Sequence, residues 1–209
     1  MHTTITTAKH KPQVRVGPED DGKRMSLSLF ARAQSVPGYH YELSNGVIQV
    51  SDIPSMTHNL TVAEIDELLT VYKIKNREVL RYHAGGDRAK MELWNRESER
   101  HPDISVYLSA PPKNIEQPWD RWIPDIAIEV VSSSSAKRDY EEKPDDYLAA
   151  GVREYWIIDP IKKSGLFLTR RADGWIENRV GRRGVWTTPL LPKFKLDLAK
   201  LFERVARQR

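Results

Sequence analysis

The stretch from Trp122 to Pro160, WIPDIAIEVVSSSSAKRDYEEKPDDYLAAGVREYWIIDP, constrains the fold more than any other part of the sequence. Its pattern predicts a strand, a polar turn, a short helix and a second strand. Glu129 lies near the end of the first apolar run, next to Val130 and Val131. A carboxylate in such surroundings must be paired with a cation or stay hydrated, because an unpaired buried charge is destabilising or takes up a proton.

Two interpretations of Glu129 follow from the alternation of side chains along a strand. In the first, Glu129 lies on the solvated face of a half-buried sheet, as is common in antiparallel sheets. In the second, it is joined by another carboxylate and a lysine to form a site. The alternation places Asp125, Ala127, Glu129 and Val131 on one face and Ile126, Ile128 and Val130 on the other.

The composition indicates one folded domain at residues 25–209, preceded by a flexible N-terminal arm at residues 1–24. The absence of Cys excludes a disulfide framework, thiolate zinc sites and a cysteine nucleophile. The first 25 residues contain no apolar signal-peptide core, and no window is long enough to span a bilayer, so we expect a cytoplasmic protein without a membrane partner. A net charge of +4 is compatible with a polyanionic partner but does not by itself indicate one.

The segments before residue 100 predict a short helix, a hairpin and a longer helix. Residues 26–33 favour a short helix, and residues 39–51 predict a hairpin around Asn45 and Gly46, the dipeptide suited to a type I′ turn. Apolar residues at helical spacing predict a helix from Met56 to about Val71, capped by Ser55 or Thr57. Two short strands are expected at residues 78–83 and 90–94, separated by a glycine turn.

Beyond residue 100, the pattern predicts a strand at residues 100–108 and a proline-containing loop at residues 109–121. After Pro160, a second hairpin is expected at residues 166–180 and a closing helix at residues 196–205. The four serines from Ser132 to Ser135 are expected to cap and to bond within their turn. Trp119, Trp122 and Tyr107 could stack on bases, although packing in the core or a loop is the stronger interpretation.

Asp103 and Glu129 are candidate ligands of one divalent ion. Asp103 begins one predicted strand and Glu129 ends the next, so their carboxylates approach each other if the two strands are antiparallel neighbours. Mg²⁺ prefers hard oxygen ligands and keeps several waters, so two carboxylates, a backbone carbonyl and a substrate phosphate would suffice. Such an ion activates a bound water and offsets charge on a phosphate.

Lys143 follows on the predicted helix and could reach back over the end of the Glu129 strand. The alternative is an ordinary exposed lysine on that helix. Pro144 directly after it is tolerated in a first turn but not in a helix interior, so we expect the helix to begin here. Lys137 is the substitute if Lys143 points away.

Several of these segments resemble the Uma2 family of putative restriction endonucleases. The resemblance spans residues 26–202 and is carried by RHPDISVYL, IPDIAIEVVSSSS, RDYEEKPDDYLAAGVREYWIIDP, YELSNG and TTPLLPKFKLDLAKLF. It implies an α/β fold of the PD-(D/E)xK nuclease superfamily, with a central mixed sheet flanked by helices and extra β-hairpins.

The resemblance also implies roles for individual residues. Asp103 would be the first metal ligand and Glu129 the second. The superfamily lysine normally stands two residues after that glutamate, where this chain has Val131, and the family places it on the following helix, at Lys143. Glu42 resembles an additional upstream acid that holds a second ion or a water, and His58 matches a recurring position without a defined role.

The favoured hypothesis is therefore a Mg²⁺-dependent endonuclease, with Mn²⁺ as a substitute, that cleaves DNA by attack of a metal-activated water. Its catalytic residues would be Asp103, Glu129, Lys143 and Glu42, and cutting two strands suggests a homodimer. The alternative is a nuclease-fold module that binds nucleic acid or a partner protein without cutting. A third interpretation places these acids on a solvated sheet face, too far apart to share an ion.

Overall fold

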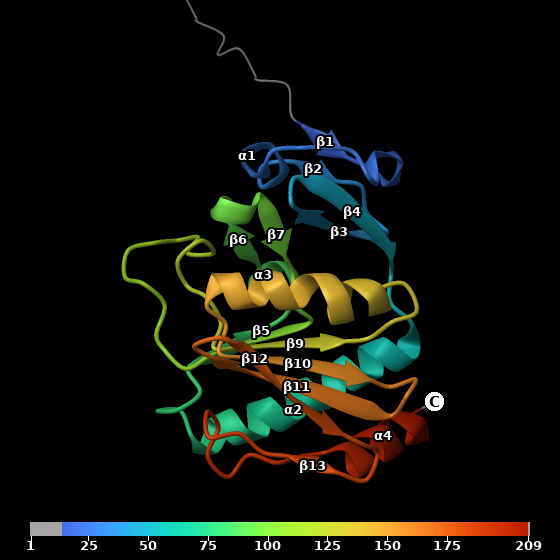
Figure 1. Ribbon diagram of the computed structural model, residues 1–209, viewed down its shortest axis with the longest axis vertical. Helices are drawn as coiled ribbons and strands as arrows, with labels where there is room; N and C mark the ends of the chain where they lie inside the picture. The colour runs from blue at the N-terminus through green and yellow to red at the C-terminus, as the bar shows by residue number, and fades with distance from the viewer. Residues whose placement is uncertain (1–13, 209) are drawn as a thin grey trace, which may run out of the picture.

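The computed structural model describes residues 14–208, and six strands of that range form a central sheet (Figure 1). β9 and β10 run parallel, while the other neighbours are antiparallel. A parallel pair needs a crossover, which is provided by η4 (Arg138–Glu142), a π-helical segment, and α3 (Lys143–Ala150). The order across the sheet is β12 (Gly174–Val180), β11 (Ser164–Arg171), β10 (Glu154–Asp159), β9 (Ile126–Val130), β8 (Ile104–Tyr107) and β5 (Tyr82–Ala84). The predicted strand–turn–helix–strand unit is therefore confirmed.

Helices cover both faces of this sheet, with α2 (Met56–Lys75) and α4 (Leu198–Arg207) on one side and α3 on the other (Figure 1). The alternation in β9 divides its side chains as expected. Ile126, Ile128 and Val130 pack with α2 and α4, whereas Ala127 packs with α3. Because both faces are covered, the interpretation of Glu129 as a solvated residue is wrong, and only 3% of it is exposed.

Both long helices begin at side-chain caps. Ser55 accepts a hydrogen bond from the backbone N–H of His58 at the start of α2, and Asp197 accepts one from Lys200 at the start of α4. α2 runs to Lys75, four residues beyond the predicted end near Val71. No helix of residues 14–208 is both long and apolar enough to cross a membrane.

A second sheet lies on the side of α3, in the order β4 (Val47–Asp52), β3 (Tyr39–Ser44), β7 (Ser98–Arg100) and β6 (Met91–Leu93) (Figure 1). The predicted hairpin is β3–β4, and Asn45 and Gly46 have the positive φ angles, 49° and 75°, of its turn. The sheet contacts the helical crossover through polar groups. The Arg100 guanidinium lies 2.8 Å from Asp146 on α3, and the Gln49 amide donates to Glu142 of η4 at 3.1 Å.

The strand predicted at residues 100–108 is confirmed only in its second half, as β8, because Arg100 belongs to a strand of the second sheet. β7 ends at Arg100 in the second sheet, and β8 starts at Ile104 in the central sheet. Pro102 between them has no N–H for a sheet ladder, which favours an interruption here. The chain therefore crosses between the sheets just before β8, and Asp103 lies at that crossing.

The bounds of several other predicted strands differ from those in the structure. The strand predicted at residues 78–83 is reduced to β5, and the one at 90–94 becomes β6 of the second sheet. The second predicted hairpin is β11–β12, and the closing helix is α4. The other elements are β1 (Arg15–Val16), η1 (Pro18–Asp20), α1 (Leu27–Phe30), β2 (Gln34–Ser35), η2 (Gly86–Arg88), η3 (Trp94–Arg96), β13 (Val185–Trp186) and β14 (Leu196–Asp197).

Part of the predicted N-terminal arm has regular structure. β1 pairs with β2, and Val16 is 1% exposed in a small apolar cluster with α1 and the β3–β4 hairpin. Residues 15–20 of the predicted arm therefore include a short strand and a 3-10 turn, and the boundary at residue 24 stays a prediction. Residues 1–13, the rest of that arm, lie outside the described residues, and the single domain expected at residues 25–209 stays a prediction.

Candidate active site

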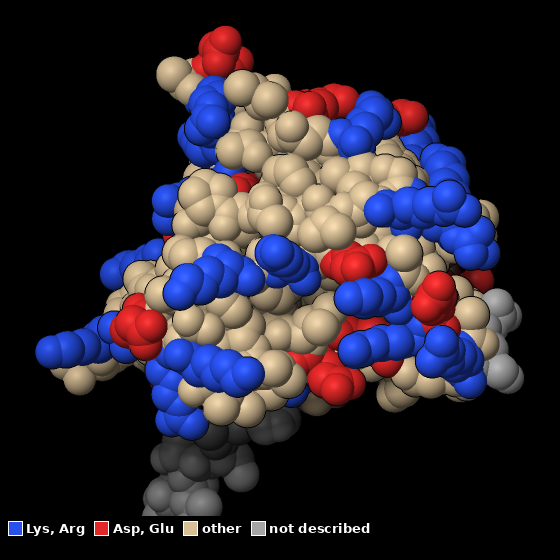
Figure 2. Space-filling model, turned by 90° about the horizontal axis from the view of Figure 1, so that it is seen from below, with Lys and Arg blue, Asp and Glu red and all other residues tan. Residues whose placement is uncertain are grey.

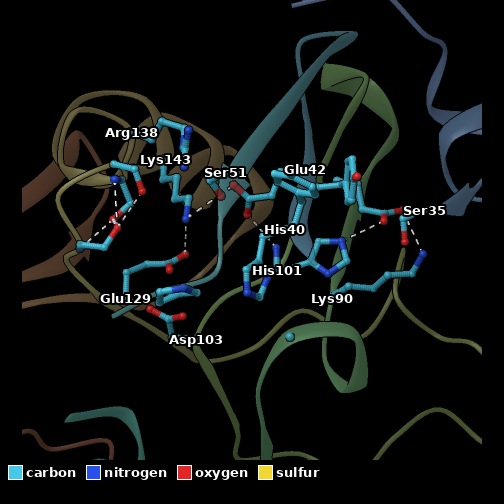
Figure 3. Close-up of a pocket in the computed structure, with 18 of the residues that line it drawn as sticks. Ser35, His40, Glu42, Ser51, Lys90, His101, Asp103, Glu129, Arg138 and Lys143 are labelled. Atoms are coloured by element: carbon cyan, nitrogen blue, oxygen red, sulfur yellow. Dashed lines mark hydrogen bonds and ion pairs between the residues drawn. The ribbon is translucent and has the colours of Figure 1, made fainter. Parts of the chain in front are cut away.

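Four residues singled out from the sequence face one pocket of about 910 Å³ between the two sheets (Figure 3). Glu42 comes from β3, Asp103 directly precedes β8, Glu129 lies in β9 and Lys143 is the first residue of α3. β8 and β9 are antiparallel neighbours, with Ile104 opposite Ile128, which is the condition under which the two carboxylates were expected to approach. The interpretation that placed these acids on a solvated sheet face is wrong for Glu42 and Glu129, whose side chains are only 12% and 4% exposed.

The Asp103 carboxylate is held by two donors at one of its oxygens. The backbone N–H of Val130 donates to Oδ2 at 2.7 Å, and Nε2 of His58 lies 3.0 Å from the same atom. Burial disfavours the charged imidazole, but the hydrogen bond and the charge of Asp103 outweigh it and raise the pKa of His58. His58 is positioned by the first turn of α2, so the start of α2 and the last residue of β9 together fix Asp103.

Gly85 explains why the diglycine turn lies against Asp103. A Cβ atom at Gly85 would lie 1.9 Å from the carbonyl oxygen of Asp103, a distance that no side chain tolerates. The neighbouring N–H of Gly86 donates to the carbonyl of Pro102 at 3.0 Å. The glycine therefore allows two backbone segments to meet, and it holds the Asp103 segment at the pocket.

Glu129 accepts two hydrogen bonds at the same oxygen, Oε1. Lys143 Nζ donates at 2.9 Å, and the phenol of Tyr147, one helical turn further along α3, donates as well. Burial and the charges of Asp103, Asp139 and Glu42 raise the pKa of Glu129 well above its usual value, against the attraction of Lys143. The pocket therefore holds an excess of negative charge, which a bound cation would offset.

Lys143 is buried, with 5% of its side chain exposed, so its interpretation as an exposed helix lysine is wrong. Nζ lies 2.9 Å from Glu129, 3.1 Å from Asp139 and 3.7 Å from Glu42. Burial opposes its charge, but the three carboxylates outweigh burial and raise the pKa of Lys143, which keeps it an ammonium. Lys137, the predicted substitute, is exposed.

η4 explains how Lys143 keeps this direction despite the proline that follows. The backbone N–H of Lys143 donates to the carbonyl of Arg138, five residues earlier, and Pro144 occupies the first turn of α3 as predicted. A proline cannot donate to the carbonyl four residues back and clashes with it in a regular helix. The wider π-helical turn accommodates this loss, and such turns are frequent at functional sites.

Glu42 belongs to the second sheet and is the third carboxylate, with Asp103 and Glu129, that was singled out from the sequence and lines the pocket. Its Oε1 accepts a hydrogen bond from the backbone N–H of His101 at 3.0 Å, and its Oε2 lies 3.5 Å from the Arg100 guanidinium. Burial alone would favour the neutral acid, but the charges of Lys143 and Arg100 outweigh it and lower the pKa of Glu42 to about 2. Glu42 is therefore an anion at neutral pH.

Other polar and aromatic residues named in the sequence analysis have structural partners. Asp125 accepts a hydrogen bond from the N–H of Leu108 at 2.8 Å and pairs with Arg153 at 3.0 Å. The Ser132 hydroxyl and the Ser135 hydroxyl each bond the other's backbone N–H, as expected for a capped turn. Trp122 is stacked on Tyr107 with ring centroids 4.0 Å apart, so these two rings are packed in a core cluster.

Sequence reasoning missed Asp139 and Tyr147. Both lie four residues from Lys143, one before it and one after it. Asp139 forms an ion pair with Lys143, and Tyr147 donates to Glu129 as Lys143 does. This spacing places the three side chains on one face of a helix, and it was the signal available in the sequence. His58 was noted without a role, and the structure brings it to Asp103.

Two carboxylate oxygens at the pocket are available as ligands of a hard divalent cation. Asp103 Oδ1 and Glu129 Oε2 accept no hydrogen bond from residues 14–208, because every contact to these carboxylates is made at the other oxygen. Among the side chains described in residues 14–86 and 88–208, no three His, Asp or Glu residues form a preassembled metal cage. Two carboxylates supply oxygen ligands of the kind that hard divalent cations prefer.

Comparison with known proteins supports the resemblance seen in the sequence. The family model described as Uma2, putative restriction endonuclease, matches residues 28–199. A crystal structure of a putative nuclease belonging to DUF820 from Anabaena variabilis superposes with a TM-score of 0.69 at 16% identity, over 87% of this chain and 99% of that one. No curated protein matches the chain. The structural match shows that the two chains share one mixed α/β fold. The family match shows that the chain belongs to the Uma2 family of putative restriction endonucleases.

Proposed function

We propose that this protein is an endonuclease that uses a divalent metal ion, Mg²⁺ or Mn²⁺, to hydrolyse phosphodiester bonds of DNA. The observation that carries the proposal is the convergence of Asp103, Glu129 and Lys143 from different elements on one pocket. Family membership supports nuclease chemistry in general, and the arrangement matches the set that the PD-(D/E)xK resemblance implies.

Asp103 and Glu129 would hold the ion through the oxygens that accept no hydrogen bond from residues 14–208. When bound, the ion supplies an acidified water and offsets charge on the phosphate. The N–H of Val130 and His58 keep Asp103 in place, and Tyr147 fixes the rotation of Glu129. These donors preorganise the two carboxylates before substrate arrives.

Lys143 has the position and charge to act on the reacting groups. Its ammonium is buried among three carboxylates, close to the end of β9. From there it would orient the attacking water or stabilise the phosphate. Glu42, on the second sheet, lies 3.7 Å from this ammonium and attracts it toward the pocket. Lys143→Ala and Lys143→Met are therefore expected to lower the rate of cleavage more than they lower DNA affinity.

The direct test is nicking of supercoiled plasmid with Mg²⁺ or Mn²⁺. Glu129→Gln and Asp103→Asn are expected to abolish nicking and to remove Mn²⁺ binding measured by calorimetry. Glu141→Gln is the matched control, because Glu141 is an exposed acid on η4, and it is expected to leave both unchanged. Nicking by Glu129→Gln at the rate of the unmodified protein would contradict the proposal.

A second candidate function is a nuclease-fold module that binds nucleic acid without cutting. It is favoured by the contacts of Lys143, whose ammonium already neutralises part of the charge that a metal ion would neutralise. This function predicts DNA binding without Mn²⁺ binding and without nicking, so the same two assays separate it from the enzyme. The homodimer and the cytoplasmic location expected from the sequence stay predictions, and light scattering at working concentration tests the first.

A further inference from the structure

The candidate pocket holds more acidic than basic side chains. A DNA or RNA strand carries a negative charge at each phosphate, and neutralising cations dominate its binding. Figure 2 shows Lys and Arg side chains spread over the opposite face, formed by α2, α4 and β13, so the net positive charge is not gathered at the pocket. The acids that line the pocket are Glu42, Asp52, Glu99, Asp103, Glu116 and Glu129, and the Lys and Arg residues are Lys90, Arg138 and Lys143.

Two of the three lining cations are neutralised by carboxylates. Lys90 Nζ lies 2.9 Å from Glu99 and 3.1 Å from Glu92, and 14% of its side chain is exposed. Lys143 has three carboxylate partners within 4 Å, as described above. Neither side chain therefore supplies an uncompensated positive charge to a second phosphate.

Arg138 differs from both in its contacts. It makes no ion pair with an Asp or Glu among residues 14–208, and its Nε is buried without a hydrogen-bond partner. It lies on η4, one turn after the serine turn that follows β9, and Figure 3 shows it on the same wall of the pocket as Lys143. A buried donor without an acceptor is unfavourable, and a small movement of the Arg138 side chain would bring its guanidinium to an oxyanion in the pocket.

We propose that Arg138 binds a backbone phosphate of the nucleic-acid strand, adjacent to the phosphate held for cleavage. The planar guanidinium matches two oxygens of a phosphate and retains its charge at any physiological pH. This inference rests on the proposed function and adds to it a substrate-binding residue that needs no metal ion. The position of Arg138 within η4, the segment that also directs Lys143, couples substrate position to the reacting groups.

The test is DNA binding by fluorescence anisotropy in EDTA, where no cleavage occurs, over a series of salt concentrations. Arg138→Gln is expected to weaken binding roughly tenfold and to lower the slope of log affinity against log salt by about one phosphate contact. Arg138→Lys keeps the positive charge but lacks the planar guanidinium. Its salt slope is therefore expected to equal that of the unmodified protein, and its affinity to lie between those of the unmodified protein and Arg138→Gln. Lys137→Gln, an exposed neighbour that does not line the pocket, is the matched control and is expected to bind as the unmodified protein does.

The outcomes separate this inference from the proposed function. In nicking assays with Mg²⁺, Arg138→Gln is expected to raise KM while kcat changes little. If the unmodified protein binds and cuts, but Arg138→Gln shows the same affinity and salt slope, the role of Arg138 is refuted and the nuclease stands. Equal losses in Arg138→Gln and Lys137→Gln also refute it, because overall charge then explains binding. If the unmodified protein neither binds nor cuts DNA, both proposals fall.

Discussion

At the scale of single residues, the charge of the pocket depends on how far nearby cations compensate its buried carboxylates. Glu42 and Glu129 come from different sheets and share Lys143, yet their pKa values move in opposite directions. Glu42 has Arg100 and a backbone N–H as additional partners, whereas burial and neighbouring acids dominate at Glu129. The same lysine therefore holds one acid as an anion and only partly compensates the other.

Glu42 makes stability depend on acidity below pH 4.5. Its pKa in the folded protein is about 2, below the value of 4.5 for a free glutamate. Because the pKa is lower in the folded protein, the Glu42 carboxylate stabilises the fold at any pH above the pKa of the unfolded chain. This contribution is lost as the pH falls from about 4.5 toward about 2. We expect urea denaturation to show a smaller loss of stability across this range for Glu42→Gln than for the unmodified protein. Parallel curves for the two proteins would contradict the assignment.

Gly85 is expected to be required at the Asp103 crossing. Gly85→Ala places a Cβ atom against the Asp103 carbonyl, and such overpacking typically costs about 1–3 kcal/mol. Calorimetric melting should therefore show a lower Tm, accompanied by weaker Mn²⁺ binding. Gly86→Asn is the control, because Gly86 has open space around its Cβ position and a φ of 59° that Asn tolerates. A normal Tm for Gly85→Ala would show that the two segments can separate without cost.

At the scale of elements, the η4–α3 crossover places most of the functional side chains. Its residues Asp139, Lys143 and Tyr147 face the end of β9, and Arg138 faces the pocket beside them. Trp175 of β12 donates to the carbonyl of Pro144 at 2.9 Å and so ties the start of α3 to the edge of the central sheet. The start of α3 is thus anchored to the central sheet by this hydrogen bond.

Gly151 ends α3 in a left-handed conformation, with φ of 98°. The N–H of Val152 donates to the carbonyl of Tyr147, which closes the helix. Open space surrounds the Cβ position, so Gly151→Ala is destabilising only through its backbone, by about 1 kcal/mol. Gly151→Asn should cost less, because Asn tolerates this conformation. Urea denaturation compares the two variants, and an Ala variant as stable as the unmodified protein would contradict this account of the helix end.

At the scale of the whole molecule, the pocket exists because two sheets are held against one crossover. Arg100 is fully buried and lies 2.8 Å from the buried Asp146 of α3, and it also donates to Ser44 at 2.7 Å and Gln49 at 3.1 Å. These contacts tie β3, β4 and β7 to α3. Glu42 is on this second sheet, so its position opposite Glu129 depends on that junction.

Breaking the junction is expected to be costly. Arg100→Met leaves Asp146 buried with Arg96 as its remaining ion-pair partner, and the loss of one member of a buried pair typically costs about 3–5 kcal/mol. The double variant Arg100→Met with Asp146→Leu should recover part of this loss, because no buried charge is then left unpaired. Lys23→Met, which breaks an exposed pair with Asp20, is the control and should change stability by less than about 1 kcal/mol. Chemical denaturation measures all four proteins, and an equal cost for the single and double variants would contradict the pairing.

Local pattern was sufficient for much of the architecture. The Asn45-Gly46 turn, the alternation in β9 and the helical spacing of α2 each depend on neighbours in the sequence, so they were predicted correctly. The chemistry of Asp103, Glu129 and Lys143 was also visible, through residue type and family resemblance. What these patterns cannot specify is which face of a strand is covered, since alternation looks the same whether the second face contacts water or a helix.

The sequence by itself determined the elements, their order and the residue types available for the site. Only the tertiary structure decided that α3 covers Glu129, that the chain changes sheets at Pro102 and that Glu42 faces Lys143 from the second sheet. It also decided that Arg138 lines the pocket without an acidic partner among residues 14–208. The physical reason is that burial and charge pairing depend on contacts between residues far apart in the chain, and no local period encodes those contacts.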